Sequence, residues 1–178
     1  MWEATGRGLA AHAIMLRDSA IVDDSIAASL LTAIDGARRG VPSDVLGSLA
    51  LVAAFDDRVD SLVATGAAGA VRIARARHDL AATAQRLVLR DRALALATAL
   101  DASRSAVIDL AESHVFTLMP VWSGSSPLQP TNVAHFLTGT IAPLGRSARK
   151  LQALYEDLDR SPILVDVFRS VTPLHRAP

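Results

Sequence analysis

The longest helical pattern in this chain, about Asp79 to Phe116, contains no glycine or proline, and it limits what the chain can fold into. Such a stretch is typical of one continuous α-helix, which at ~1.5 Å per residue would be roughly 55 Å long. Apolar residues recur in it every seven positions, interrupted at Asp101, and a second apolar stripe lies beside the first. A helix that is apolar over so much of its surface belongs inside a helical bundle.

Helical patterns also dominate the rest of the chain, and no segment shows the sustained alternation of apolar and polar residues that is typical of a strand. Further helices are expected at about 3–18, 24–36, 43–64 and 130–159. A loop is expected at 123–127, and Pro143 should kink or weaken the last helix. The predicted fold is therefore all-α, a helical bundle built on two long antiparallel helices at about 79–116 and 130–159.

Three regions follow from this pattern. Residues 1–70 form a region of short helices, residues 71–162 contain the two long bundle helices, and residues 163–178 form an irregular tail with little periodicity. Two long helices cannot bury both apolar stripes between them. We therefore expect an oligomer, formed either with other copies of this chain or with a second, different chain.

Composition excludes several classes of function. Eighteen Lys and Arg residues balance eighteen Asp and Glu residues, which excludes a nucleic-acid binder that works through bulk positive charge. The absence of cysteine excludes disulfides, thiolate nucleophiles and cysteine-ligated zinc. No paired-histidine spacing typical of metal sites is present, so we predict no metal and no cofactor. Apolar runs are shorter than the roughly 18 residues of a membrane span and no leader pattern is evident, so we expect a cytoplasmic protein without a membrane partner.

Three segments resemble sequences of one enzyme family. Residues 69–79 read GAVRIARARHD, residues 114–120 read HVFTLMP and lead into Leu128-Gln129-Pro130, and residues 11–16 read AHAIML. In this order and spacing they resemble argininosuccinate lyases, whose first signature reads GRLHTARSRND and whose second reads TxMPGYTHLQxAQP. The resemblance covers about residues 3 to 162.

This resemblance implies a member of the fumarase/aspartase superfamily. Such proteins are α-helical homotetramers whose long central helices pack into a shared bundle, and they eliminate fumarate from succinyl compounds. A serine on a mobile loop acts as the base, and each active site takes residues from three subunits. The third signature of the family, which carries that serine, lies C-terminal to the matched region. We therefore interpret the chain as a truncated member that resembles the N-terminal and first central-helix part of the family.

The chain departs from the family at the catalytic motifs. The Thr-His pair of the second signature falls on Ser123 and Gly124, and a glycine has no side chain that could move a proton. The following glutamine falls on Ser126, and the Ser and Asn of the first signature fall on Ala76 and His78. We predict that ordinary argininosuccinate cleavage has been lost.

The residues that remain predict a site for a small anionic molecule. A guanidinium group offers a planar fork of donors to a carboxylate, and an imidazole can gain or lose a proton near neutral pH. The predicted substrate-binding residues are Arg75, Arg77, Ser125 and Gln129. The predicted catalytic residues are His78, Ser123 and Ser126. The alternative is a solvated loop beside a helix start, with a structural histidine and an ordinary serine-rich turn.

Three functions stay open. The first is an enzyme of the old fold repurposed for elimination, isomerisation or cyclisation of a small molecule by proton transfer, for example in a biosynthetic pathway. The second is a non-catalytic binding or partner subunit of a lyase-like complex. The third is a degenerate, truncated lyase without chemistry.

Overall fold

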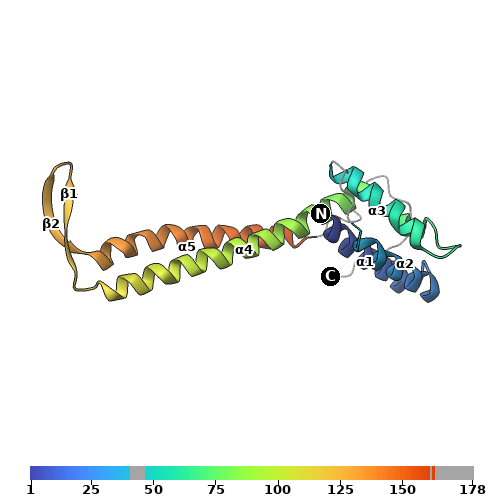
Figure 1. Ribbon diagram of the computed structural model, residues 1–178, viewed down its shortest axis with the longest axis horizontal. Helices are drawn as coiled ribbons and strands as arrows, with labels where there is room; N and C mark the ends of the chain where they lie inside the picture. Colours follow the sequence, from blue (N-terminus) through green and yellow to red (C-terminus); the bar gives the residue numbers. More distant parts are fainter. Residues whose placement is uncertain (41–46, 161, 163–178) are drawn as a thin grey trace. The chain divides into compact units, whose positions relative to one another are not determined.

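The computed structural model describes residues 1–40, 47–160 and 162, and these residues form five α-helices, one short 3₁₀ helix and a two-stranded sheet (Figure 1). The elements are α1 (Trp2–Asp18), α2 (Asp24–Arg38), α3 (Ser48–Leu62), η1 (Ala70–Arg72), α4 (Arg77–Ser113), β1 (Leu118–Ser123), β2 (Ser126–Asn132) and α5 (Val133–Leu158). The all-α prediction is confirmed, and the two long helices lie within three residues of their expected ends. The expected tail at 163–178, and residues 43–46 of the expected third helix, lie outside the described residues.

The chain divides into two compact units, one containing Met1–Leu89 together with Arg160 and the other containing Arg90–Asp159. This division does not test the three regions expected from the sequence, which stay a prediction. The helix α4 contributes residues to both units.

The first unit has a closed apolar core. The ring of Trp2 on α1 lies 4.6 Å from the ring of Phe55 on α3, and the Trp2 indole nitrogen donates a 3.0 Å hydrogen bond to the carbonyl of Ala37 on α2. Phe55 and Leu80 have no solvent-exposed surface. Asp23 caps the start of α2: its carboxylate accepts a 2.7 Å hydrogen bond from the Ile26 amide and so satisfies one free donor of the helix. Three helices and the start of α4 thus bury one another's apolar faces.

The second unit pairs α4 with α5 in antiparallel directions. Arg90, early in this part of α4, contacts the end of α5: it donates a 2.8 Å hydrogen bond to the Tyr155 hydroxyl and forms a 2.7 Å ion pair with Asp159. The helix α5 runs through Pro143 as one element and has no buried residue. Of the apolar side chains in this fully described stretch, only Ala93 and Ala111 are buried.

The segment between the long helices corrects the sequence prediction, because it is a β-hairpin and not a loop. β1 and β2 pair antiparallel from Leu118 opposite Asn132 to Ser123 opposite Ser126, with an irregularity after Val121. Prolines normally argue against a strand because they cannot donate a ladder hydrogen bond. Both strands of a two-stranded sheet are edges, however, so the prolines of this hairpin are tolerated.

Candidate functional site

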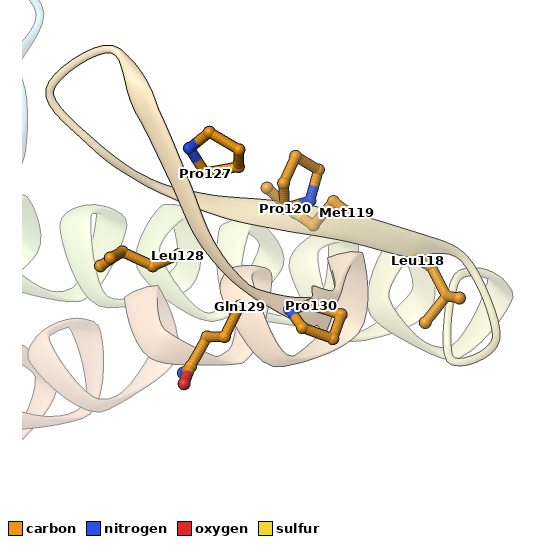
Figure 2. A pocket seen from close by; sticks show the side chains of 7 residues that line it. All are labelled: Leu118, Met119, Pro120, Pro127, Leu128, Gln129 and Pro130. Carbon is orange, nitrogen blue, oxygen red and sulfur yellow. The ribbon is translucent and has the colours of Figure 1, made fainter.

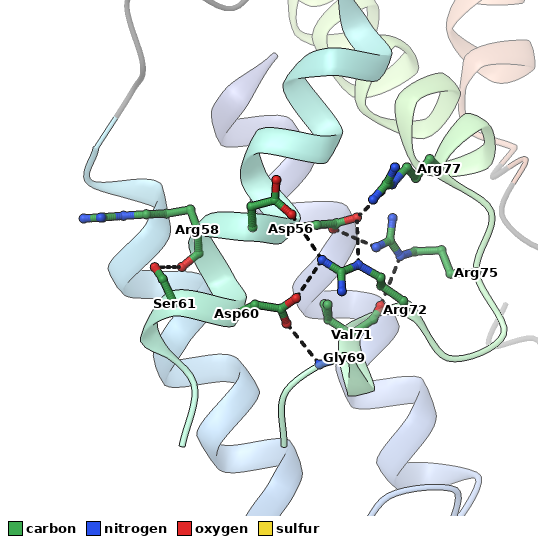
Figure 3. Close-up of polar contacts among 10 residues, drawn as sticks. Asp56, Arg58, Asp60, Ser61, Gly69, Val71, Arg72, Arg75 and Arg77 are labelled. Atoms are coloured by element: carbon green, nitrogen blue, oxygen red, sulfur yellow. Dashed lines mark hydrogen bonds and ion pairs between the residues drawn. The ribbon is translucent and has the colours of Figure 1, made fainter. Parts of the chain in front are cut away.

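The first candidate site is a cluster of charged side chains around Asp56 of α3 (Figure 3). Asp56 lies on the apolar face of this helix, in register with Val52 and Val59, and its side chain has no exposed surface. A buried carboxylate is costly unless cationic and hydrogen-bonding groups surround it. Here the cationic groups come from the segment between α3 and α4.

Arg75 is the closest partner of Asp56. Its Nη2 lies 2.7 Å from Asp56 Oδ1, its Nε donates a 3.2 Å hydrogen bond to the Val71 carbonyl, and its side chain is fully buried. The structure therefore gives the Arg75 guanidinium an internal carboxylate partner. Its predicted contact with a substrate stays a prediction.

Other contacts fasten the same segment to the helices. Asp60 accepts a 3.1 Å hydrogen bond from the Gly69 amide and forms a 2.6 Å ion pair with Arg72. From α1, the buried His12 ring places Nε2 2.9 Å from the Ile73 carbonyl. Burial lowers the pKa of His12, so the neutral imidazole that donates this hydrogen bond is favoured. The backbone leading into α4 is thus held from two sides.

Arg77 and His78 begin α4 immediately after this fastened segment, and both are exposed. Arg77 Nε lies 3.7 Å from Asp56 Oδ2, while about half of the Arg77 side chain stays accessible to solvent. The start of a long helix carries partial positive charge and free amide donors. A guanidinium and an imidazole at this place form a surface that can hold a carboxylate.

The predicted serines lie elsewhere, around the tip of the hairpin. Ser123 ends β1, Gly124 and Ser125 form the turn, and Ser126 begins β2, all of them exposed. Gly124 has a φ of 60°, a left-handed conformation that glycine adopts without strain and that two-residue hairpin turns require. The residue that replaces the family's histidine therefore has a structural reason to be glycine.

An apolar hollow of about 440 Å³ lies beside the hairpin (Figure 2). It is lined by Leu118, Met119, Pro120, Pro127, Leu128, Gln129 and Pro130. Gln129, a predicted substrate-binding residue, is its only side chain with an amide. Because no charged side chain lines this hollow, it suits an apolar group better than a carboxylate.

The predicted site residues thus fall into two groups. Arg75, Arg77 and His78 lie in the first unit, whereas the three serines and Gln129 lie in the second, and most of α4 separates the two groups along the chain. Sequence reasoning missed Asp56 and the role of His12. The available signal was a carboxylate at the helical spacing of the buried Val52 and Val59.

The part of the chain that the structure describes shows neither a metal cluster nor a membrane-spanning helix. No group of three or more His, Cys, Asp or Glu side chains is placed to hold a metal ion there. None of the helices in the same residues combines the length and apolar character needed to cross a membrane.

Sequence comparison identifies relatives over most of the chain. An argininosuccinate lyase from Natronomonas pharaonis is 31% identical over 153 residues, which is 86% of this chain and 31% of the relative. An argininosuccinate lyase from Methanoculleus marisnigri is 30% identical over 180 residues, covering 94% of this chain and 35% of the relative. The chain belongs to the argininosuccinate lyase family. It spans about a third of the length of the curated relatives it matches. No family model matches the chain.

Solved structures show the same fold in another lyase and in a cycloisomerase. An EDDS lyase in complex with formate matches 96% of this chain with a TM-score of 0.85 and 25% identity, and this chain covers 34% of that structure. A β-carboxy-cis,cis-muconate cycloisomerase from Acinetobacter calcoaceticus matches with a TM-score of 0.74. The matched region is 86% of this chain and 37% of that structure. Its 17% identity shows a shared fold alone. This is a lyase-like chain with the helical architecture of the fumarase/aspartase superfamily.

Proposed function

We propose that this lyase-like chain binds a small carboxylate-bearing molecule at the start of α4, with Arg77 and His78 as the contact residues. The observation that carries the proposal is the placement of Arg77, which follows a fastened segment and begins α4 with about half of its side chain exposed. A guanidinium binds a carboxylate through two parallel hydrogen bonds, and the helix start adds favourable charge. A related EDDS lyase has been solved with formate and a variant of it with fumarate, both carboxylates.

The reaction in this proposal is a proton transfer on the bound anion, leading to elimination, isomerisation or cyclisation. His78 is the proposed acid or base, since its exposed imidazole stands beside Arg77. Ser123 and Ser126 remain proposed catalytic residues, and Ser125 and Gln129 remain proposed contacts. Gly124 offers no group for the transfer, so ordinary argininosuccinate cleavage is proposed to be lost.

The second unit favours an assembly. Leu94, Leu96 and Leu110 on α4 are each about half exposed, as is Leu154 on α5. Beside them a groove of about 460 Å³ lies between the two helices, lined by apolar side chains such as Ala97 and Leu151. We propose that other helices cover this surface in an oligomer, formed with copies of this chain or with a lyase-like partner. The same surface supports the second candidate function, a non-catalytic subunit of such a complex.

One set of measurements on the purified protein separates these functions. We expect no fumarate release from argininosuccinate, followed by ultraviolet absorbance, and we expect fumarate itself to bind, followed by calorimetry. Arg77→Ala should weaken fumarate binding at least tenfold, whereas Arg58→Ala, an exposed arginine on α3, should leave it unchanged. Release of fumarate at an enzymatic rate would show that the parent reaction survives. Equal binding by both variants would contradict the proposed site.

A further inference from the structure

The two carboxylate oxygens of Asp56 have different partners. Oδ1 is paired with Arg75 Nη2 at 2.7 Å. Oδ2 lies 3.7 Å from Arg77 Nε and 4.0 Å from Arg72 Nε, and it accepts no hydrogen bond within the described residues. One buried carboxylate therefore contacts both the arginine that is sealed inside the unit and the arginine that reaches solvent.

Arg72 does not depend on Asp56 for its balance of charge. Its Nη2 is 2.6 Å from Asp60 and 3.3 Å from Asp57. For Arg77, in contrast, Asp56 is the one ion-pair partner found among the described residues. The contact is made at Nε, so the two Nη groups on the other edge of the guanidinium stay available to a ligand.

We propose that Asp56 is a positioning residue, whose ion pair with Arg77 Nε orients the guanidinium so that its Nη edge faces an incoming carboxylate. This inference rests on the proposed function, because it gives Arg77 the contact with the anion. Asp56 itself is buried, so the proposal gives it no contact with the anion. Its second task is to pair with Arg75, which keeps the segment before α4 in place.

The sign of the effect separates positioning from simple electrostatics. A negative charge near Arg77 repels an anionic ligand, so removing that charge alone should tighten binding. A positioning role predicts the opposite, since an unheld side chain loses rotamer freedom each time it binds. Weaker binding after removal of a repelling charge is a result that electrostatics alone does not give.

The experiment uses the full chain, fumarate as the probe, and the matched variants Asp56→Asn and Asp57→Asn. Asp57 is the next residue on α3, but its side chain is exposed and it pairs with Arg72. We expect Asp56→Asn to weaken fumarate binding about tenfold and Asp57→Asn to leave it unchanged or slightly tighter. Circular dichroism and a cooperative unfolding transition confirm that each variant is folded. Unchanged or tighter binding by a folded Asp56→Asn protein overturns the proposal.

A measurement on the unmutated protein covers the case in which Asp56→Asn fails to fold. The NMR order parameters of the Nε–Hε groups report how strongly each guanidinium is held. We expect Arg77 to be clearly more ordered than Arg58, and an Arg77 signal as mobile as that of Arg58 overturns the proposal. Absence of fumarate binding by the unmutated protein would contradict the proposed function, and an ordered Arg77 in that protein would still support its positioning by Asp56.

Discussion

The two units of this chain solve the problem of burying apolar side chains in different ways. In the first unit, Phe55 and Leu80 have no exposed surface, and even a carboxylate, Asp56, is enclosed with its cationic partner. In the second unit, Leu96 is 56% exposed and Leu94 is 50% exposed, although both belong to the apolar stripes of the longest helix. Similar sequence patterns therefore give a finished core in one unit and an open surface in the other.

The two units therefore obtain their stability from different sources. The first unit has enough helices to cover its apolar faces within one chain. The second has two antiparallel helices and a hairpin, which is too little to enclose a core, so its apolar stripes are suited to packing against further helices. The candidate ligand contacts Arg77 and His78 lie in the first unit, whose core is closed within one chain.

The largest effect we expect comes from truncating a buried side chain in the core of the first unit. Phe55→Ala should lower the free energy of unfolding by about 3–5 kcal/mol, because it removes a fully buried ring that packs against Trp2. Leu96→Ala in the second unit should change the same quantity by no more than about 0.5 kcal/mol in the monomer. Urea denaturation followed by circular dichroism measures both. Equal losses would mean that the two units are packed alike, and the comparison would fail.

The next effect concerns assembly. The paired substitutions Leu96→Asp and Leu110→Asp put charges on the exposed stripe of α4 and should weaken self-association at least tenfold, which is about 1.4 kcal/mol. Leu49→Asp, on an exposed position of α3, is the matched control and should leave association unchanged. Sedimentation velocity over a range of concentrations gives the result. If the unmutated protein sediments as a monomer throughout, the open surface is not a self-association surface.

The sequence alone predicts the helices, but it does not predict the contacts between segments that lie far apart in the chain. The absence of glycine and proline from 79–116 made the long helix predictable, since nothing in that stretch interrupts helical hydrogen bonding. The hairpin was missed because Pro120 and Pro127 argue against strands and no alternation compensates for them. Arg75 and Arg77 have the same chemistry in the sequence. Only the fold distinguishes them. Arg75 is buried in its pair with Asp56, which lies 19 residues earlier in the chain, whereas about half of the Arg77 side chain stays exposed.

A smaller effect should appear in the pH dependence of stability, through His12 of the first unit. Burial lowers the pKa of His12, and the hydrogen bond to the Ile73 carbonyl acts against that shift without reversing it. The unfolded chain therefore binds a proton at a higher pH than the folded chain does. Stability contributed by the neutral ring is complete above the unfolded pKa near 6.5 and is lost as the pH falls below it, by at most about 1.4 kcal/mol per pH unit.

The test compares the unmutated protein with His12→Gln, whose amide can still donate to the Ile73 carbonyl. Unfolding free energies measured from pH 7.5 downward, at about half-unit steps, should show an extra loss in the unmutated protein alone, because the other histidines are common to both proteins. Parallel curves would show that His12 takes up its proton in the folded state as readily as in the unfolded state.

The smallest effect concerns helix N-caps, because each unit has one of the same kind. Asp23 accepts a 2.7 Å hydrogen bond from the Ile26 amide at the start of α2, and Asn132 accepts one of the same length from the His135 amide at the start of α5. Each cap satisfies one donor at the start of its helix, so the local cost of losing either cap should be alike, about 1 kcal/mol.

In the first unit, Asp23→Ala should lower the global unfolding free energy by that amount, because α2 is part of the common core. In the second, Asn132→Ala should raise amide hydrogen exchange at the start of α5 and leave global unfolding nearly unchanged, because no side chain of α5 is buried. A global loss from both variants would show that α5 is as firmly joined to its unit as α2 is to the first.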